Sequence, residues 1–103
     1  MKASDISDFE IYRQVLKSVR RFRGEHNGLE PVGAIIWHIQ EALEGYPAKV
    51  VLAKCRQMIA KKRLDGCGCG CRGDFNIPER LTVDGTLLTP VETSAYLREN
   101  GVE

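Results

Sequence analysis

The run Gly66-Cys67-Gly68-Cys69-Gly70-Cys71-Arg72-Gly73 divides this sequence into two parts with different hydrophobic patterns. Before the run, apolar residues recur every three or four positions, which is typical of helices. After it, short segments with period two and strong turn signals are typical of strands. The chain has 103 residues, which suits one small domain and leaves no room for two. We therefore predict a single α+β domain over residues 1–103.

Three helices are predicted before the glycine-cysteine run. The first, over residues 7–24, opens with a capping box, and its apolar residues share one face. The second and third, over residues 31–45 and about 47–63, each open with a proline at the first helical position, where its missing N–H costs nothing. Trp37 projects away from the apolar stripe of the second helix, which makes it a candidate interface residue.

Two hairpins and a last helix are predicted beyond the third helix. The glycine-cysteine run and residues 74–77 form the first hairpin. Residues 80–83 and 86–89 form the second around Asp84-Gly85, a pair that favours a tight primed turn. Thr89 then repeats the capping pattern before a helix that extends to about residue 99.

Charge is distributed unevenly along the chain, although the formal net charge is only +1. Residues 1–44 carry six basic and seven acidic side chains, residues 45–73 carry seven and one, and residues 74–103 carry two and six. The middle segment is thus strongly basic. Such a segment is expected of a surface that meets phosphates, and a solvated helix face is the alternative.

Three helices with a short turn between the second and third, followed by a hairpin, resemble the winged-helix branch of the helix-turn-helix family. The stretch Val15-Leu16-Lys17-Ser18-Val19-Arg20-Arg21-Phe22, followed by a proline-started helix, is similar to the DNA-binding domain of the SOS-response repressor. A second segment is similar to a recognition helix that continues into the first strand of the wing. This segment is Val51-Leu52-Ala53-Lys54-Cys55-Arg56-Gln57-Met58-Ile59-Ala60-Lys61-Lys62-Arg63-Leu64-Asp65-Gly66. The resemblance implies a winged-helix core over residues 8–78, with a wing at 64–77 and a C-terminal extension at 79–103.

The resemblance also implies that the third helix enters the major groove of double-stranded DNA. Gln57 is then placed to read an adenine edge, and Ala53 to meet a thymine methyl group. Basic residues on the helix and beside the wing are expected near phosphates. The predicted DNA contacts are Lys49, Ala53, Lys54, Arg56, Gln57, Lys61, Lys62, Arg63 and Arg72.

The clustered thiols of Cys67, Cys69 and Cys71 predict a metal or redox role, because disulfides are disfavoured in a cytosolic chain. Zinc needs four ligands, so a fourth would come from elsewhere in this chain or from another chain. An iron–sulfur cluster is the other option, and the run resembles the cysteine-bearing wing of the small ferrous-iron transport regulator. A flexible reduced wing is the alternative. Cys55 is assigned to the core.

Motifs of catalysis and targeting are not found in this sequence. It has no phosphate loop, nucleophile elbow or recognisable catalytic set of Ser and His residues, so we do not expect an enzyme. The N-terminal residues lack the apolar region of a secretory signal, and the apolar runs are far too short to cross a bilayer. A cytoplasmic location without membrane contact is the expectation.

Two functions of different class remain open from the sequence. The first is a small DNA-binding regulatory protein with a metal- or redox-responsive wing. The second is a winged-helix protein-interaction or metal-sensing adaptor that does not bind DNA, with Trp37 as an anchor. A homodimer through Trp37 or through Val91, Ala95 and Tyr96 of the last helix is compatible with either.

Overall fold

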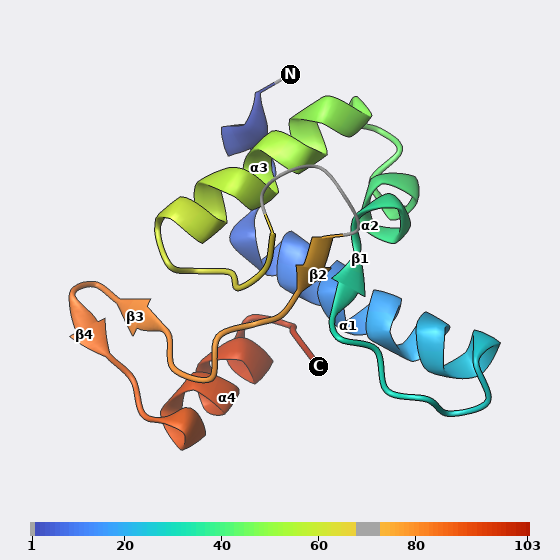
Figure 1. The fold of residues 1–103 in the computed structure, drawn as a ribbon. Helices are drawn as coiled ribbons and strands as arrows, with labels where there is room; N and C mark the ends of the chain where they lie inside the picture. Colours follow the sequence, from blue (N-terminus) through green and yellow to red (C-terminus); the bar gives the residue numbers. More distant parts are fainter. Residues whose placement is uncertain (1, 68–72) are drawn as a thin grey trace.

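Helices make up most of the regular structure, and two small sheets complete it (Figure 1). The computed structural model describes residues 2–67 and 73–103. Its helices and strands, in chain order, are η1 (Ala3–Asp5), α1 (Asp8–Glu25), β1 (Ala34–Ile35), α2 (Ile36–Ala42), α3 (Ala48–Ala60), β2 (Gly73–Phe75), β3 (Thr82–Val83), β4 (Thr86–Leu87) and α4 (Pro90–Glu99). The Cα radius of gyration is 13.2 Å, close to the value of about 13 Å expected for a compact domain of this length. The α+β class is confirmed.

Helix α1 forms one side of the core, with α2 and β1 packed against it, and α3 packs against α2 and η1. Ser7 caps its N-terminus, because the Ser7 hydroxyl accepts a hydrogen bond from the Phe9 N–H at 3.2 Å. The full capping box expected there is wrong, since the Glu10 carboxylate pairs with Arg13 instead. Phe75 of β2 is fully buried and closes the core from the strand side.

The start of the second helix was predicted five residues too early. Helix α2 begins at Ile36, because Ala34 and Ile35 form β1 and pair antiparallel with β2. Val32, which the prediction places in the first turn of that helix, is 74% exposed. At Gly33 an added Cβ would lie 2.5 Å from the Asp74 carbonyl carbon, so the two backbones approach more closely than a side chain allows. Strand pairing therefore overrides the local helix signal of Pro31.

The segment after α3 runs antiparallel to β2, as the predicted first hairpin requires. Helix α3 ends at Ala60, a few residues before the predicted end, and Lys62 adopts a positive φ of 60°. Asp65 and Asn76 exchange two backbone hydrogen bonds of 2.9 Å, and the Cys67 N–H donates to the Gly73 carbonyl at 2.8 Å. The extended segment around β2 thus lies between β1 and the chain that leaves α3.

The C-terminal extension folds as predicted from local signals. Asp84 and Gly85 both have positive φ and join β3 to β4, as a primed turn requires. The Thr89–Glu92 capping box opens α4. The hydroxyl of Thr93 accepts from the Leu81 N–H at 3.0 Å, which ties α4 to the chain before the hairpin. Within residues 2–67 and 73–103, no helix has the length and apolar character needed to cross a membrane.

Candidate nucleic-acid interface

Helix α3 presents an exposed face of basic and small residues. Lys49, Arg56 and Gln57 are exposed, and Ala53 is partly exposed between them. The opposite face enters the core through Val51, Cys55 and Met58, which are at most 1% exposed. Lys61 and Lys62 continue the exposed basic series past the end of the helix. We call Lys49, Ala53, Arg56, Gln57, Lys61 and Lys62 the α3 face.

Lys54 and Arg63 lie apart from the α3 face, although both are among the predicted DNA contacts. Lys54 is rotated by about 140° from Lys49 around an ideal helix, and its side chain is only 11% exposed. Its ammonium group pairs with Asp8, and the Arg63 guanidinium pairs with the same carboxylate at 3.1 Å. Both cations are therefore partly neutralised at the start of α1.

Three arginines of α1 differ from the lysines of the α3 face in their charge partners. Arg13 pairs with Glu10, Arg23 pairs with Glu30 at 2.8 Å, and Arg21 pairs with two glutamates. In contrast, no carboxylate of the described residues lies within 4.0 Å of the ammonium groups of Lys49, Lys61 and Lys62. The carboxylates that do form ion pairs are those of Asp8, Glu10, Glu25, Glu30 and Glu41. The positive potential of the middle segment thus stays at the α3 face.

A short connection fixes α3 against α2. The Tyr46 N–H donates to the Leu43 carbonyl at 2.9 Å, which closes the turn after α2. The Gln40 amide donates to the Ala48 carbonyl at 3.0 Å and so joins α2 to the first turn of α3. The sequence predicted the turn, but not the contact of Gln40, because that residue has no distinctive local pattern.

The two described cysteines differ in exposure. Cys55 is fully buried, and burial raises the pKa of its thiol to about 12, which agrees with the core role predicted for it. Cys67 is exposed beside Gly73. Cys69, Cys71 and Arg72 lie outside the described residues. Across residues 2–67 and 73–103, no three His, Cys, Asp or Glu side chains are placed to hold a metal ion. Metal or cluster binding at the run stays a prediction.

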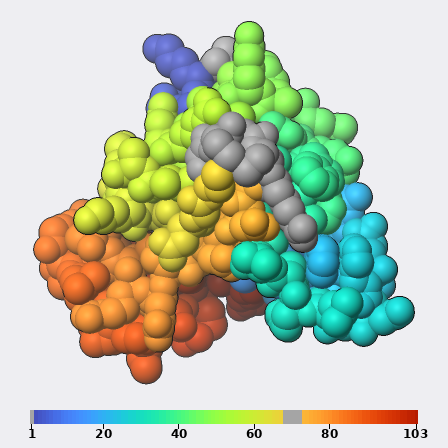
Figure 2. All heavy atoms as spheres, viewed as in Figure 1, coloured from blue at the N-terminus to red at the C-terminus, as the bar shows by residue number. Residues whose placement is uncertain are grey.

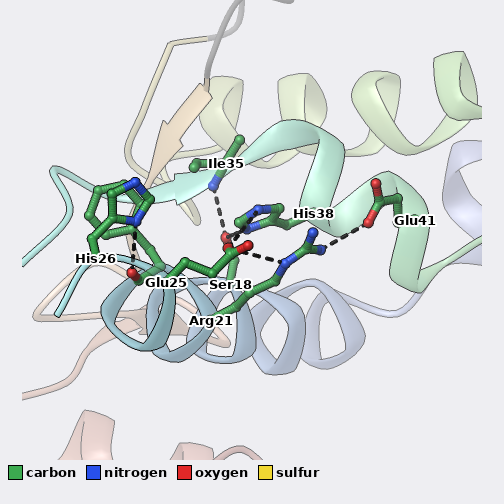
Figure 3. A network of polar contacts seen from close by, with 8 residues as sticks. Ser18, Arg21, Glu25, His26, Ile35, His38 and Glu41 are labelled. Carbon is green, nitrogen blue, oxygen red and sulfur yellow. Dashed lines mark hydrogen bonds and ion pairs between the residues drawn. The ribbon is translucent and has the colours of Figure 1, made fainter. Parts of the chain in front are cut away.

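A polar network that is buried at Ser18 and His38 joins α1 to β1 and α2, and the sequence did not predict it (Figure 3). The Ser18 hydroxyl accepts from the Ile35 N–H at 2.9 Å and lies 2.9 Å from Nδ1 of His38. Nε2 of His38 is 4.0 Å from Glu25, and Arg21 links Glu25 to Glu41. Burial, followed by the nearby Arg21 charge, lowers the pKa of His38 below its usual value.

The order Ser18, His38, Glu25 resembles a nucleophile-base-acid arrangement, but its geometry is structural. Ser18 is 3% exposed, and its oxygen already accepts a backbone hydrogen bond. The direction of its hydrogen bond with Nδ1 of His38 depends on the imidazole tautomer. The contact therefore satisfies the Ile35 amide and orients His38, and it offers no accessible nucleophile.

Trp37 is exposed, as its position on the helical wheel predicted. It is 49% exposed at the start of α2 and borders an open cavity of about 460 Å³. The rings of His26 and Phe22 stack in parallel in the lining of the same cavity, with ring centroids 3.9 Å apart.

Comparison of the chain with protein-family models, with curated proteins and with solved structures found no match.

Proposed function

We propose that this chain is a winged-helix protein that binds double-stranded DNA through the α3 face. The order of α1, α2 and α3 supports this proposal, as does the antiparallel pairing of Asp65 with Asn76 after α3. The observation that carries it is the difference in pairing: Arg13, Arg21 and Arg23 of α1 have carboxylate partners, whereas Lys49, Lys61 and Lys62 have none among the described residues. Unpaired cations on one exposed face attract phosphates and release counterions when they bind.

Within the proposal, the residues of the α3 face have different tasks. Lys49, Arg56, Lys61 and Lys62 contact phosphates, which positions the helix. Gln57 is the candidate for adenine readout, and the small side chain of Ala53 lets the helix approach a thymine methyl group. Lys54 and Arg63 are secondary contacts in this scheme, because Asp8 competes with phosphate for both.

Fluorescence anisotropy with a labelled duplex of about 20 base pairs tests the proposal at about 50 and 200 mM salt. We expect Lys49→Gln/Lys61→Gln to weaken binding at least about tenfold at the lower salt concentration and to reduce the slope of log K against log salt by about two. The matched control is Lys17→Gln/Arg98→Gln, which removes two exposed positive charges from α1 and α4. Absence of binding by the unmodified chain, or equal loss in both variants, would contradict the proposal.

A second candidate is the adaptor that does not bind DNA, and the exposure of Trp37 favours it. An exposed tryptophan beside a cavity is typical of an interface anchor. For an adaptor we expect Trp37→Ala to lose a partner in a pull-down, or to change its oligomeric state, while its unfolding midpoint stays the same. An unchanged partner set and oligomeric state would remove Trp37 from this role.

A further inference from the structure

The C-terminal extension contains a groove that the DNA-binding proposal does not use. It runs between one face of the β3–β4 hairpin and one face of α4, with a volume of about 520 Å³. These two elements form the lobe at the lower left of Figure 2. The groove is lined by Val83, Asp84, Thr86, Leu88, Glu92, Ala95, Tyr96 and Glu99.

The floor of this groove is apolar, and its shape follows from helix and strand periodicity. Ala95 and Tyr96 lie one turn after Glu92 on the same side of α4, and Val83 and Leu88 face them from the hairpin. Tyr96 is held in place by an edge-to-face contact with Phe9, with ring centroids 5.6 Å apart. The floor is therefore anchored to α1 and can accept an apolar side chain without rearrangement.

The rim of the groove is acidic. Asp84 is at the hairpin turn, and Glu99 is in the last turn of α4, where the helix dipole disfavours a carboxylate. Neither residue forms an ion pair with a described cation. Glu92 accepts from the Thr89 N–H, which holds its pKa below the usual value. Arg80 is the nearby cation, and its Nε donates to the Leu88 carbonyl.

We propose that this groove binds a basic segment of a partner protein, with an apolar side chain on the floor and lysine or arginine side chains at the Asp84 and Glu99 rim. Charge complementarity favours this occupant. The acidic rim repels the phosphates of a nucleic acid, and the apolar floor has no ligand atoms for a free metal ion. Exposed Val91, one turn before Ala95, extends the apolar strip along α4. The surface is distinct from the α3 face, so the chain could hold DNA and a protein partner with separate residues.

The charge part is tested with two labelled peptides of about ten residues. One contains leucine and lysine, and in the other each lysine is replaced by glutamine. Anisotropy should show binding of the lysine peptide alone, and Asp84→Asn/Glu99→Gln should weaken it about fivefold or more. Asparagine tolerates the positive φ at position 84. The control Glu44→Gln/Glu103→Gln removes the same charge from exposed sites outside the groove and should bind like the unmodified chain.

The floor part is tested with Ala95→Arg, which places a long cationic side chain in the groove, against Ser94→Arg on the adjacent side of α4. We expect Ala95→Arg to abolish peptide binding and Ser94→Arg to retain it. Equal binding of both peptides, unchanged binding by Asp84→Asn/Glu99→Gln, or equal loss in the charge control would overturn the proposal. Self-association that Asp84→Asn/Glu99→Gln abolishes, without peptide binding, would also overturn it, because the occupant would then be a second copy of this chain.

Discussion

At the residue scale, His38 shows how one buried contact makes stability depend on pH. Its imidazole is 8% exposed and is hydrogen-bonded to the Ser18 hydroxyl at 2.9 Å, and burial disfavours the charged ring. Burial and Arg21 lower its pKa, whereas Glu25 and Glu41 act weakly in the opposite direction. In the unfolded chain the ring takes up a proton near its usual pKa of about 6.5. Stability from His38 is therefore complete above that pH and is lost as the pH falls through the folded-state pKa.

We predict that the free energy of unfolding falls between about pH 7.5 and pH 5.5, and that His38→Asn, whose amide oxygen can accept from Ser18, removes most of this fall. Urea titrations at both pH values measure it. The control is His26→Asn, because His26 is the exposed histidine of the chain and should leave the pH dependence in place. The same loss in both variants would mean that His38 is not the group responsible.

At the scale of elements, Gly33 decides where β1 can lie. An added Cβ would meet the Asp74 carbonyl carbon and oxygen at 2.5 and 2.6 Å, and both are backbone atoms that cannot move cheaply. We expect Gly33→Ala to lower the free energy of unfolding by about 2 kcal/mol or more. Gly24→Ala is the matched control: it lies in α1 with nothing within 4 Å of the added Cβ, and it should stabilise by about 0.5–1 kcal/mol. Chemical denaturation measures both.

Elements with local signals were predictable from the sequence, and elements that depend on distant pairing were not. Periodicity and capping residues located α1, α3 and α4, and Asp84-Gly85 located the β3–β4 turn. Strand β1 was missed because its pairing with β2 joins segments some forty residues apart. The predicted site residues differ in the same way. Gln57, predicted as a DNA contact, is exposed on α3, whereas the pairing of Lys54 with Asp8 depends on the tertiary fold.

At the scale of the whole molecule, the net charge of +1 hides two surfaces of opposite sign. Glutamates pair with Arg13, Arg21 and Arg23 of α1. Among the described residues, Lys49, Lys61 and Lys62 of the α3 face have no carboxylate partner, and Asp84 and Glu99 of the C-terminal extension form no ion pair. In Figure 1, α3 and α4 lie on opposite sides of the β1–β2 pair. Since opposite potentials attract different partners, the two surfaces support separate binding roles in one small domain.

Asp8 links α1 to α3, because its carboxylate forms ion pairs with Lys54 of α3 and with Arg63 just after that helix. We expect Asp8→Asn to lower the free energy of unfolding by about 2 kcal/mol, since it leaves the largely buried Lys54 ammonium without its partner. Adding Lys54→Met should recover much of the loss, because an apolar chain of similar length needs no counter-charge. Urea unfolding of the two single variants and the double variant gives the coupling energy. If the two effects simply add, Asp8 acts through the α1 N-terminus alone, and the link between α1 and α3 rests on packing.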